Sequence, residues 1–205
     1  MIGCGQNGAQ SVAQQRTVYW LQSVTILWML VESGVSLYAA ITAHSLALLA
    51  FGGDSFVEFL SAGVALLAFV PSFFLSRDRA ARCAGILLFA LAAVIVVSVP
   101  LALLSGSQPE TSCAGVAITA AALVVMPGLA WLKRRTARAT DSPALAADAV
   151  QSATCAYLAA ITLASLGINA VFHIHWVDSA AALVVLPILF IEGRRAMRGE
   201  QCACC

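Results

Sequence analysis

Long apolar runs separated by short polar breaks restrict this chain more than any other feature of its sequence. A helix crosses the hydrocarbon core of a bilayer with roughly 20 apolar residues. Only 10% of the 205 residues are charged, whereas soluble domains carry about 25%. Six runs approach or exceed the required length: residues 18–43, 45–74, 83–104, 113–132, 143–172 and 176–191. The sequence therefore predicts an all-α integral membrane protein built as a six-transmembrane-helix bundle.

The runs divide the chain into three predicted parts. Residues 1–17 form a polar N-terminal segment, residues 18–198 the transmembrane domain, and residues 199–205 a Cys-rich C-terminal tail. The N-terminal segment lacks the basic start of a signal peptide and precedes a long apolar run, so we do not expect cleavage. The crowded tail cysteines suit thiol or metal chemistry in a reducing compartment better than structural disulfides.

The 11 Lys and Arg residues predict the orientation of the bundle. They precede the first run, follow the sixth, and lie in the connections after the second and fourth: Arg16; Arg77, Arg79 and Arg82; Lys133, Arg134, Arg135 and Arg138; Arg194, Arg195 and Arg198. With six spans, all these segments fall on one side, which the positive-inside rule makes cytoplasmic. We therefore expect both termini in the cytoplasm and a multi-pass protein of the cell inner (cytoplasmic) membrane.

Acidic residues inside the runs are the strongest functional signal. An Asp at the centre of a membrane helix costs about 2.5 to 3.5 kcal/mol, and no Lys or Arg lies within a run to neutralise it. Asp54 and Glu58 are four residues apart and project from one face of a helix. A divalent cation between them removes their repulsion, and without it the pair must hold a proton. The pair predicts metal and proton binding; the alternative is a helix-end pair in interfacial water.

Two further acids lie within the runs. Asp148 is about one and a half turns into the fifth run and is followed by Gln151, Ser152 and Cys155 on nearby positions. Either Asp148 faces the acidic pair across the bundle and completes a site, or it is a solvated first-turn acid stabilised by the helix dipole. Glu32, in the middle of the first run, is a candidate fourth ligand, proton carrier or hydrogen-bonded structural acid.

Other polar residues give weaker signals. His44, His173 and His175 lie on the non-cytoplasmic side, where histidines can collect cations but are more often solvated. Asp178 is expected to cap the sixth helix or to lie at the interface. The sequence contains no nucleophile elbow, phosphate loop or zinc-protease pair. We therefore expect no enzyme and no organic cofactor, and topology explains the basic segments without nucleic acid.

Three stretches of the sequence resemble the cation diffusion facilitator (cation efflux) family. Residues 45–55, with Glu58, are similar to the second helix of that family, and residues 147–152 to its fifth. Residues 175–183, with 192–196, are similar to its sixth helix. The resemblance covers helices 1, 2, 5 and 6. It implies six helices with both termini inside, often a homodimer, and export of divalent metal against protons, with ligands on helices 2 and 5.

The resemblance also implies roles for individual residues. It places Asp54 and Glu58 at the ligand positions of helix 2, and Asp148 at the second ligand position of helix 5. The first helix-5 position, commonly His or Asp, is Ala144 here. The fourth ligand is then one of the remaining candidates: Glu32, Gln151, Ser152 or water.

The metal remains zinc, manganese or iron. An oxygen-rich site without His favours manganese or iron, whereas the Cys tail favours zinc. The chain stops soon after helix 6, so we expect that the cytoplasmic domain usual in the family is missing and that any homodimer rests on the membrane helices.

These observations lead to two hypotheses of different classes. The first is a divalent transition-metal efflux transporter, working by proton antiport, whose partners are the lipid bilayer, the metal ion and protons. The alternative is a non-transporting metal-binding or regulatory membrane protein that acts through the Cys-rich tail. A membrane enzyme is the least supported class.

Overall fold

Six helices make up the fold in a computed structural model that describes residues 4–67, 77–105, 109–110, 112–140 and 143–198. The helices are α1 (Cys4–Ala43), α2 (Leu46–Leu67), α3 (Arg77–Ser105), α4 (Cys113–Thr140), α5 (Pro143–Phe172) and α6 (Trp176–Arg198). Five of them, all except α2, contain a described stretch long and apolar enough to cross a membrane. The predicted six-helix membrane bundle is confirmed.

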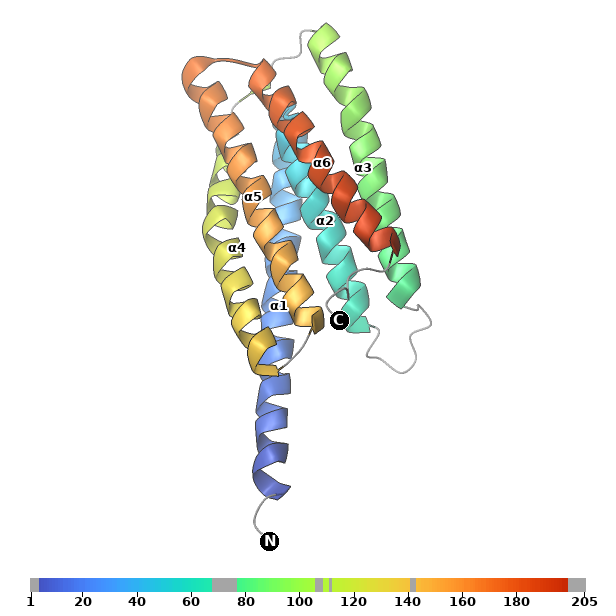
Figure 1. Cartoon of the computed structure of the whole chain (residues 1–205). Helices are drawn as coiled ribbons and strands as arrows, with labels where there is room; N and C mark the ends of the chain where they lie inside the picture. Colours follow the sequence, from blue (N-terminus) through green and yellow to red (C-terminus); the bar gives the residue numbers. More distant parts are fainter. Residues whose placement is uncertain (1–3, 68–76, 106–108, 111, 141–142, 199–205) are drawn as a thin grey trace.

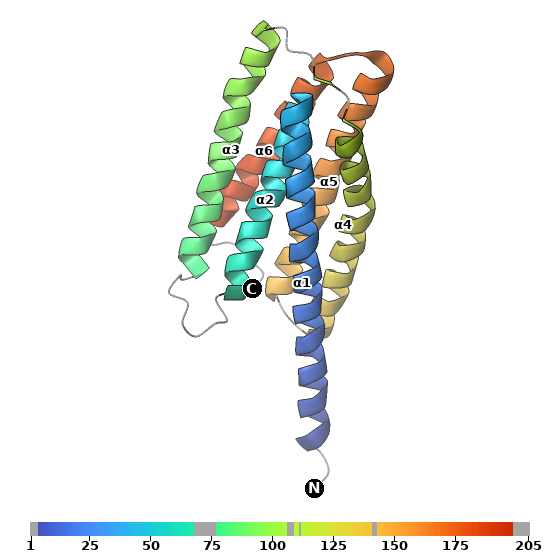
Figure 2. The same ribbon diagram turned by 180° about the vertical axis from the view of Figure 1, so that it is seen from behind.

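Consecutive helices run in opposite directions and form an up-and-down bundle (Figure 1). The beginning of α1 and the end of α6 therefore lie at the same end of the molecule. That end also holds the beginning of α3 and the end of α4, which carry most of the basic residues (Figure 2). The clustering of positive charge at one end agrees with the topology expected from the sequence.

The helices extend beyond the apolar runs. The α1 helix begins at Cys4, so it continues through most of the polar N-terminal segment and projects past the rest of the bundle in Figure 1. The α4 helix continues from Leu132, where the apolar run ends, to Thr140. Lys133 to Arg138 thus belong to a helix rather than to a connection. A helix satisfies its own backbone hydrogen bonds, so it need not stop where the apolar sequence stops.

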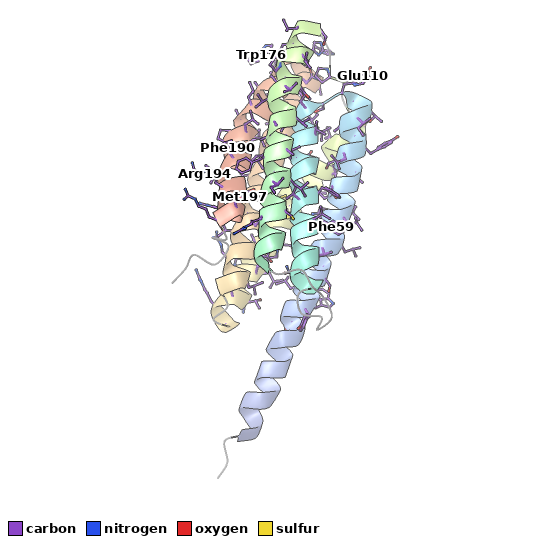
Figure 3. The ribbon with its side chains drawn as sticks, turned by 90° about the vertical axis from the view of Figure 1, so that its right-hand side faces the viewer. Phe59, Glu110, Trp176, Phe190, Arg194 and Met197 are labelled. Atoms are coloured by element: carbon purple, nitrogen blue, oxygen red, sulfur yellow. The ribbon has the colours of Figure 1, made fainter. Side chains whose placement is uncertain are left out.

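Glycines set the closest approaches between helices. A Cβ atom on Gly52 would lie 2.8 Å from the Cβ of Ser36, so α1 and α2 can approach this closely only because residue 52 has no side chain. A Cβ on Gly85 would lie 2.9 Å from the carbonyl oxygen of Gly193, which gives α3 and α6 the same kind of contact. Figure 3 shows Phe190 and Met197 of α6 beside α3. The contact between Gly52 and Ser36 brings α2 against the C-terminal part of α1.

A buried aspartate joins α6 to the start of α2. Asp178 is 3% exposed and accepts hydrogen bonds from Ser45 Oγ at 2.5 Å, Leu46 N at 2.6 Å and Ala47 N at 3.3 Å. These donors are the orphan groups at a helix N-terminus, which carries partial positive charge. The expectation that Asp178 caps α6 is wrong, because its carboxylate caps α2 instead. Its role is structural.

The first two histidines of the chain occupy structural positions at helix ends. His44 and His173 have positive φ angles of 51° and 54°, and each directly follows the last residue of a helix. The amide of Ser45 bonds to the carbonyl of Ala40, and the amide of His173 to that of Asn169, as in helix C-terminal caps. Both histidine side chains are exposed and lie at the end of the bundle opposite the basic residues.

Candidate metal site

Buried acids from three helices gather in the interior of the bundle. Glu32 of α1 is 0% exposed, and Asp54 and Glu58 of α2 are 3% and 5% exposed. The four-residue spacing on α2 puts the last two on one face, as predicted. Glu192 of α6 is partly buried and interacts electrostatically with both of them. The interior therefore concentrates acidic groups where lipid surrounds the bundle.

Glu32 is held by hydrogen bonds from three helices. Its Oε2 atom accepts a bond from Trp28 Nε1 at 2.5 Å, one turn earlier on α1. Its Oε1 atom accepts bonds from Ser55 Oγ of α2 at 2.6 Å and from Cys155 Sγ of α5 at 3.2 Å. Both oxygens thus have neutral donors. Of the three roles considered for Glu32, this arrangement fits best that of a hydrogen-bonded structural acid.

Glu192 of α6 interacts electrostatically with Asp54 of α2. Two buried carboxyl groups that act on one another cannot both be ionised without cost, so such a pair favours holding a proton. Glu192 was not among the predicted site residues. A signal was present, since Glu192 lies three and seven residues after Leu189 and Val185, on the buried stripe of α6.

Glu58 has an open acceptor. Its Oε2 atom is buried and has no hydrogen-bond partner in the described part of the chain. The charges that act on it come from four residues on four helices: Asp54, Glu192, Lys133 and Asp148. A buried carboxylate oxygen without a partner is costly. Glu58 is therefore the residue of this cluster that most needs a further ligand.

Asp148 pairs with a lysine. The Nζ atom of Lys133 lies 2.9 Å from Asp148 Oδ2 and donates a hydrogen bond to Ser152 Oγ at 2.8 Å. Lys133 is 0% exposed, whereas the side chain of Asp148 is 24% exposed. The expectation that no Lys or Arg reaches into a span is wrong, since the helical stripe that buries Met126 and Ala130 continues through Lys133. Asp148 is therefore not a freely solvated acid. In this arrangement Lys133 occupies the position beside its carboxylate that a cation would take.

The structure describes the burial of two further candidates on α5. Gln151 is partly buried on α5, and Ser152 is fully buried. The side chain of Ala144 and the Cys-rich tail, residues 199–205, fall outside the described residues. Among the side chains that the structure does describe, no three His, Cys, Asp or Glu residues are grouped so as to hold a metal ion. The structure brings Asp54, Glu58 and Glu192 together and pairs Asp148 with Lys133.

A model of the cation efflux transmembrane domain matches residues 77–199, well over half of the 205-residue chain. The chain belongs to the cation efflux family. It is a multi-pass membrane cation transporter of a family that moves divalent metal cations and whose members are not enzymes. No curated protein matched the chain. The matched segment includes Lys133, Asp148 and Glu192, whereas the acidic pair of α2 precedes it.

Proposed function

We propose that the protein exports a divalent transition metal from the cytoplasm across the inner membrane in exchange for protons. Asp54 and Glu58 form the core of its site, and Asp148 is a third ligand. The remaining candidates for the coordination shell are Glu32, Gln151 and Ser152. The observation that carries the proposal is the buried, unpartnered Oε2 atom of Glu58, one helical turn from Asp54 and within the electrostatic influence of Glu192.

The arrangement supports exchange of metal for protons by simple competition. Two interacting buried carboxyl groups such as Asp54 and Glu192 favour holding a proton, and a divalent ion bound to the same groups removes the need for it. Metal entry therefore releases the proton, and reprotonation weakens the metal site. Coupled to a conformational change that opens the site to one side at a time, this competition gives antiport. The basic end of the bundle is the cytoplasmic entrance.

The metal is zinc, manganese or iron. The cluster offers carboxylate oxygens and the hydroxyl of Ser152, which suit manganese and iron, and the thiol of Cys155 adds one soft donor beside Glu32. The bilayer, the metal ion and protons are the partners that this mechanism requires. A homodimer would form through the membrane helices.

The test is metal flux into inverted vesicles that contain the whole chain. The wild type should accumulate at least one of Zn²⁺, Mn²⁺ and Fe²⁺ when a proton gradient is applied, and Asp54→Ala should reduce this flux about 100-fold while inserting normally. Glu110→Ala is the matched control, because Glu110 is an exposed acid at the end of the bundle opposite the basic residues and outside the site. Equal flux in Asp54→Ala and the wild type would contradict the proposal.

A further inference from the structure

Lys133 differs from its basic neighbours in where its side chain lies. Arg134, Arg135 and Arg138 are exposed at the end of α4, and the guanidinium of Arg135 lies 5.6 Å from the ring centre of Trp131. Lys133 instead enters the bundle and is fully buried. A buried lysine in a membrane protein is costly, so its position calls for a function.

The ammonium group of Lys133 occupies the α5 half of the proposed metal site. It contacts Asp148 Oδ2 at 2.9 Å and Ser152 Oγ at 2.8 Å, and both residues are candidate ligands. Its charge also acts on Glu58 across the bundle. A metal ion that binds Asp148 together with the α2 carboxylates must therefore enter the space around this ammonium.

On the basis of the proposed function, we propose that Lys133 is a tethered cation that holds the α5 half of the metal site and is displaced by the metal ion. In the metal-free state the ammonium neutralises Asp148. When the metal arrives, it takes over this neutralisation, and the flexible four-carbon stem lets the ammonium move away. The returning ammonium then competes with the bound metal and favours its release. The site thus exchanges one cation for another.

This role predicts that neutralising Lys133 tightens metal binding. We expect Lys133→Met to bind Zn²⁺ and Mn²⁺ at least about tenfold more tightly than the wild type, because repulsion between the ammonium and the divalent ion is lost. Lys133→Arg keeps the charge and should bind within about threefold of the wild type. Arg134→Met, which removes an exposed charge from the next position, should leave the affinity within about twofold. The measurement is calorimetric titration of the whole chain in detergent.

A second pair of variants keeps the test valid if Lys133→Met fails to fold. Asp148→Asn leaves the ammonium without its partner, so metal binding should weaken strongly. Lys133→Met combined with Asp148→Asn removes both charges and leaves no unpaired ion. The double variant should bind metal at least about tenfold more tightly than Asp148→Asn alone, because only the ammonium differs between them. Size-exclusion chromatography in detergent identifies the folded variants.

Three outcomes overturn the proposal. One is equal or weaker metal binding in folded Lys133→Met, and in the double variant relative to Asp148→Asn. A second is that Lys133→Arg binds metal as tightly as Lys133→Met. The weaker binding of the wild type would then come from the shape of the lysine side chain and not from its charge. Both leave the proposed function standing if the wild type binds metal. Absence of metal binding in the wild type and in every variant would contradict the proposed function together with the role of Lys133.

Discussion

Asp54 and Asp178 are buried to the same extent, each 3% exposed, but their surroundings are opposite. Asp178 accepts three hydrogen bonds, from Ser45 Oγ and two backbone amides at the start of α2. Asp54 faces other acids, Glu58 and Glu192. Burial alone therefore does not identify a functional carboxylate. What separates the two is whether the protein itself supplies the compensating donors.

The cap formed by Asp178 should be a large contributor to stability. Asp178→Ala leaves Ser45 Oγ and the amides of Leu46 and Ala47 without their acceptor, so the free energy of unfolding should fall by about 3 kcal/mol. Thermal unfolding in detergent measures the loss. Glu110→Ala, an exposed acid near the same end, should change stability by less than about 0.5 kcal/mol. A normal melting temperature for Asp178→Ala would mean that the cap is not structural.

Asp54 should behave in the opposite way in the same measurement. Asp54→Asn removes one acid from a group of acids, and its amide can donate to Glu58, so the free energy of unfolding should rise or change by less than about 1 kcal/mol. Metal flux should nevertheless fall about 100-fold, as for Asp54→Ala. A destabilisation as large as that of Asp178→Ala would remove the distinction between the two aspartates.

Glu192 tests whether the acidic region holds an exchangeable proton. Glu192→Gln leaves Asp54 as the one titratable carboxyl group of the pair, and its amide can donate to the ionised form of Asp54, which no longer needs to hold a proton. We expect metal binding to release about one proton fewer than in the wild type, and proton-driven flux to fall about tenfold. Calorimetry in buffers of different ionisation enthalpy counts the protons. An unchanged count would place the exchanged proton on another group.

The sequence predicted the helices and the two acids of α2 for clear physical reasons. The length of an apolar run decides whether it can cross a bilayer, and the spacing of Asp54 and Glu58 puts them on one face whatever the packing. Lys133 was assigned to a connection because hydropathy changes at Leu132, while the helix and its buried stripe continue. Which partner that side chain meets depends on the contact between α4 and α5. Glu192 was missed because its role needs α6 packed beside α2.

Replacing Glu32 should have the smallest effect among these variants. It tests whether Glu32 belongs with the hydrogen-bonded structural carboxylates, such as Asp178, or with the metal site. Glu32 lies beside the acidic cluster, yet Trp28, Ser55 and Cys155 supply donors to both of its oxygens, as in the surroundings of Asp178. In Glu32→Gln the amide carbonyl still accepts the bonds of Ser55 and Cys155, so metal affinity should change by less than about threefold. Calorimetric titration with Mn²⁺ measures it, with Glu58→Gln as the comparison, where we expect at least about a tenfold loss. An equal loss in the two variants would make Glu32 a ligand and move the boundary of the site onto α1.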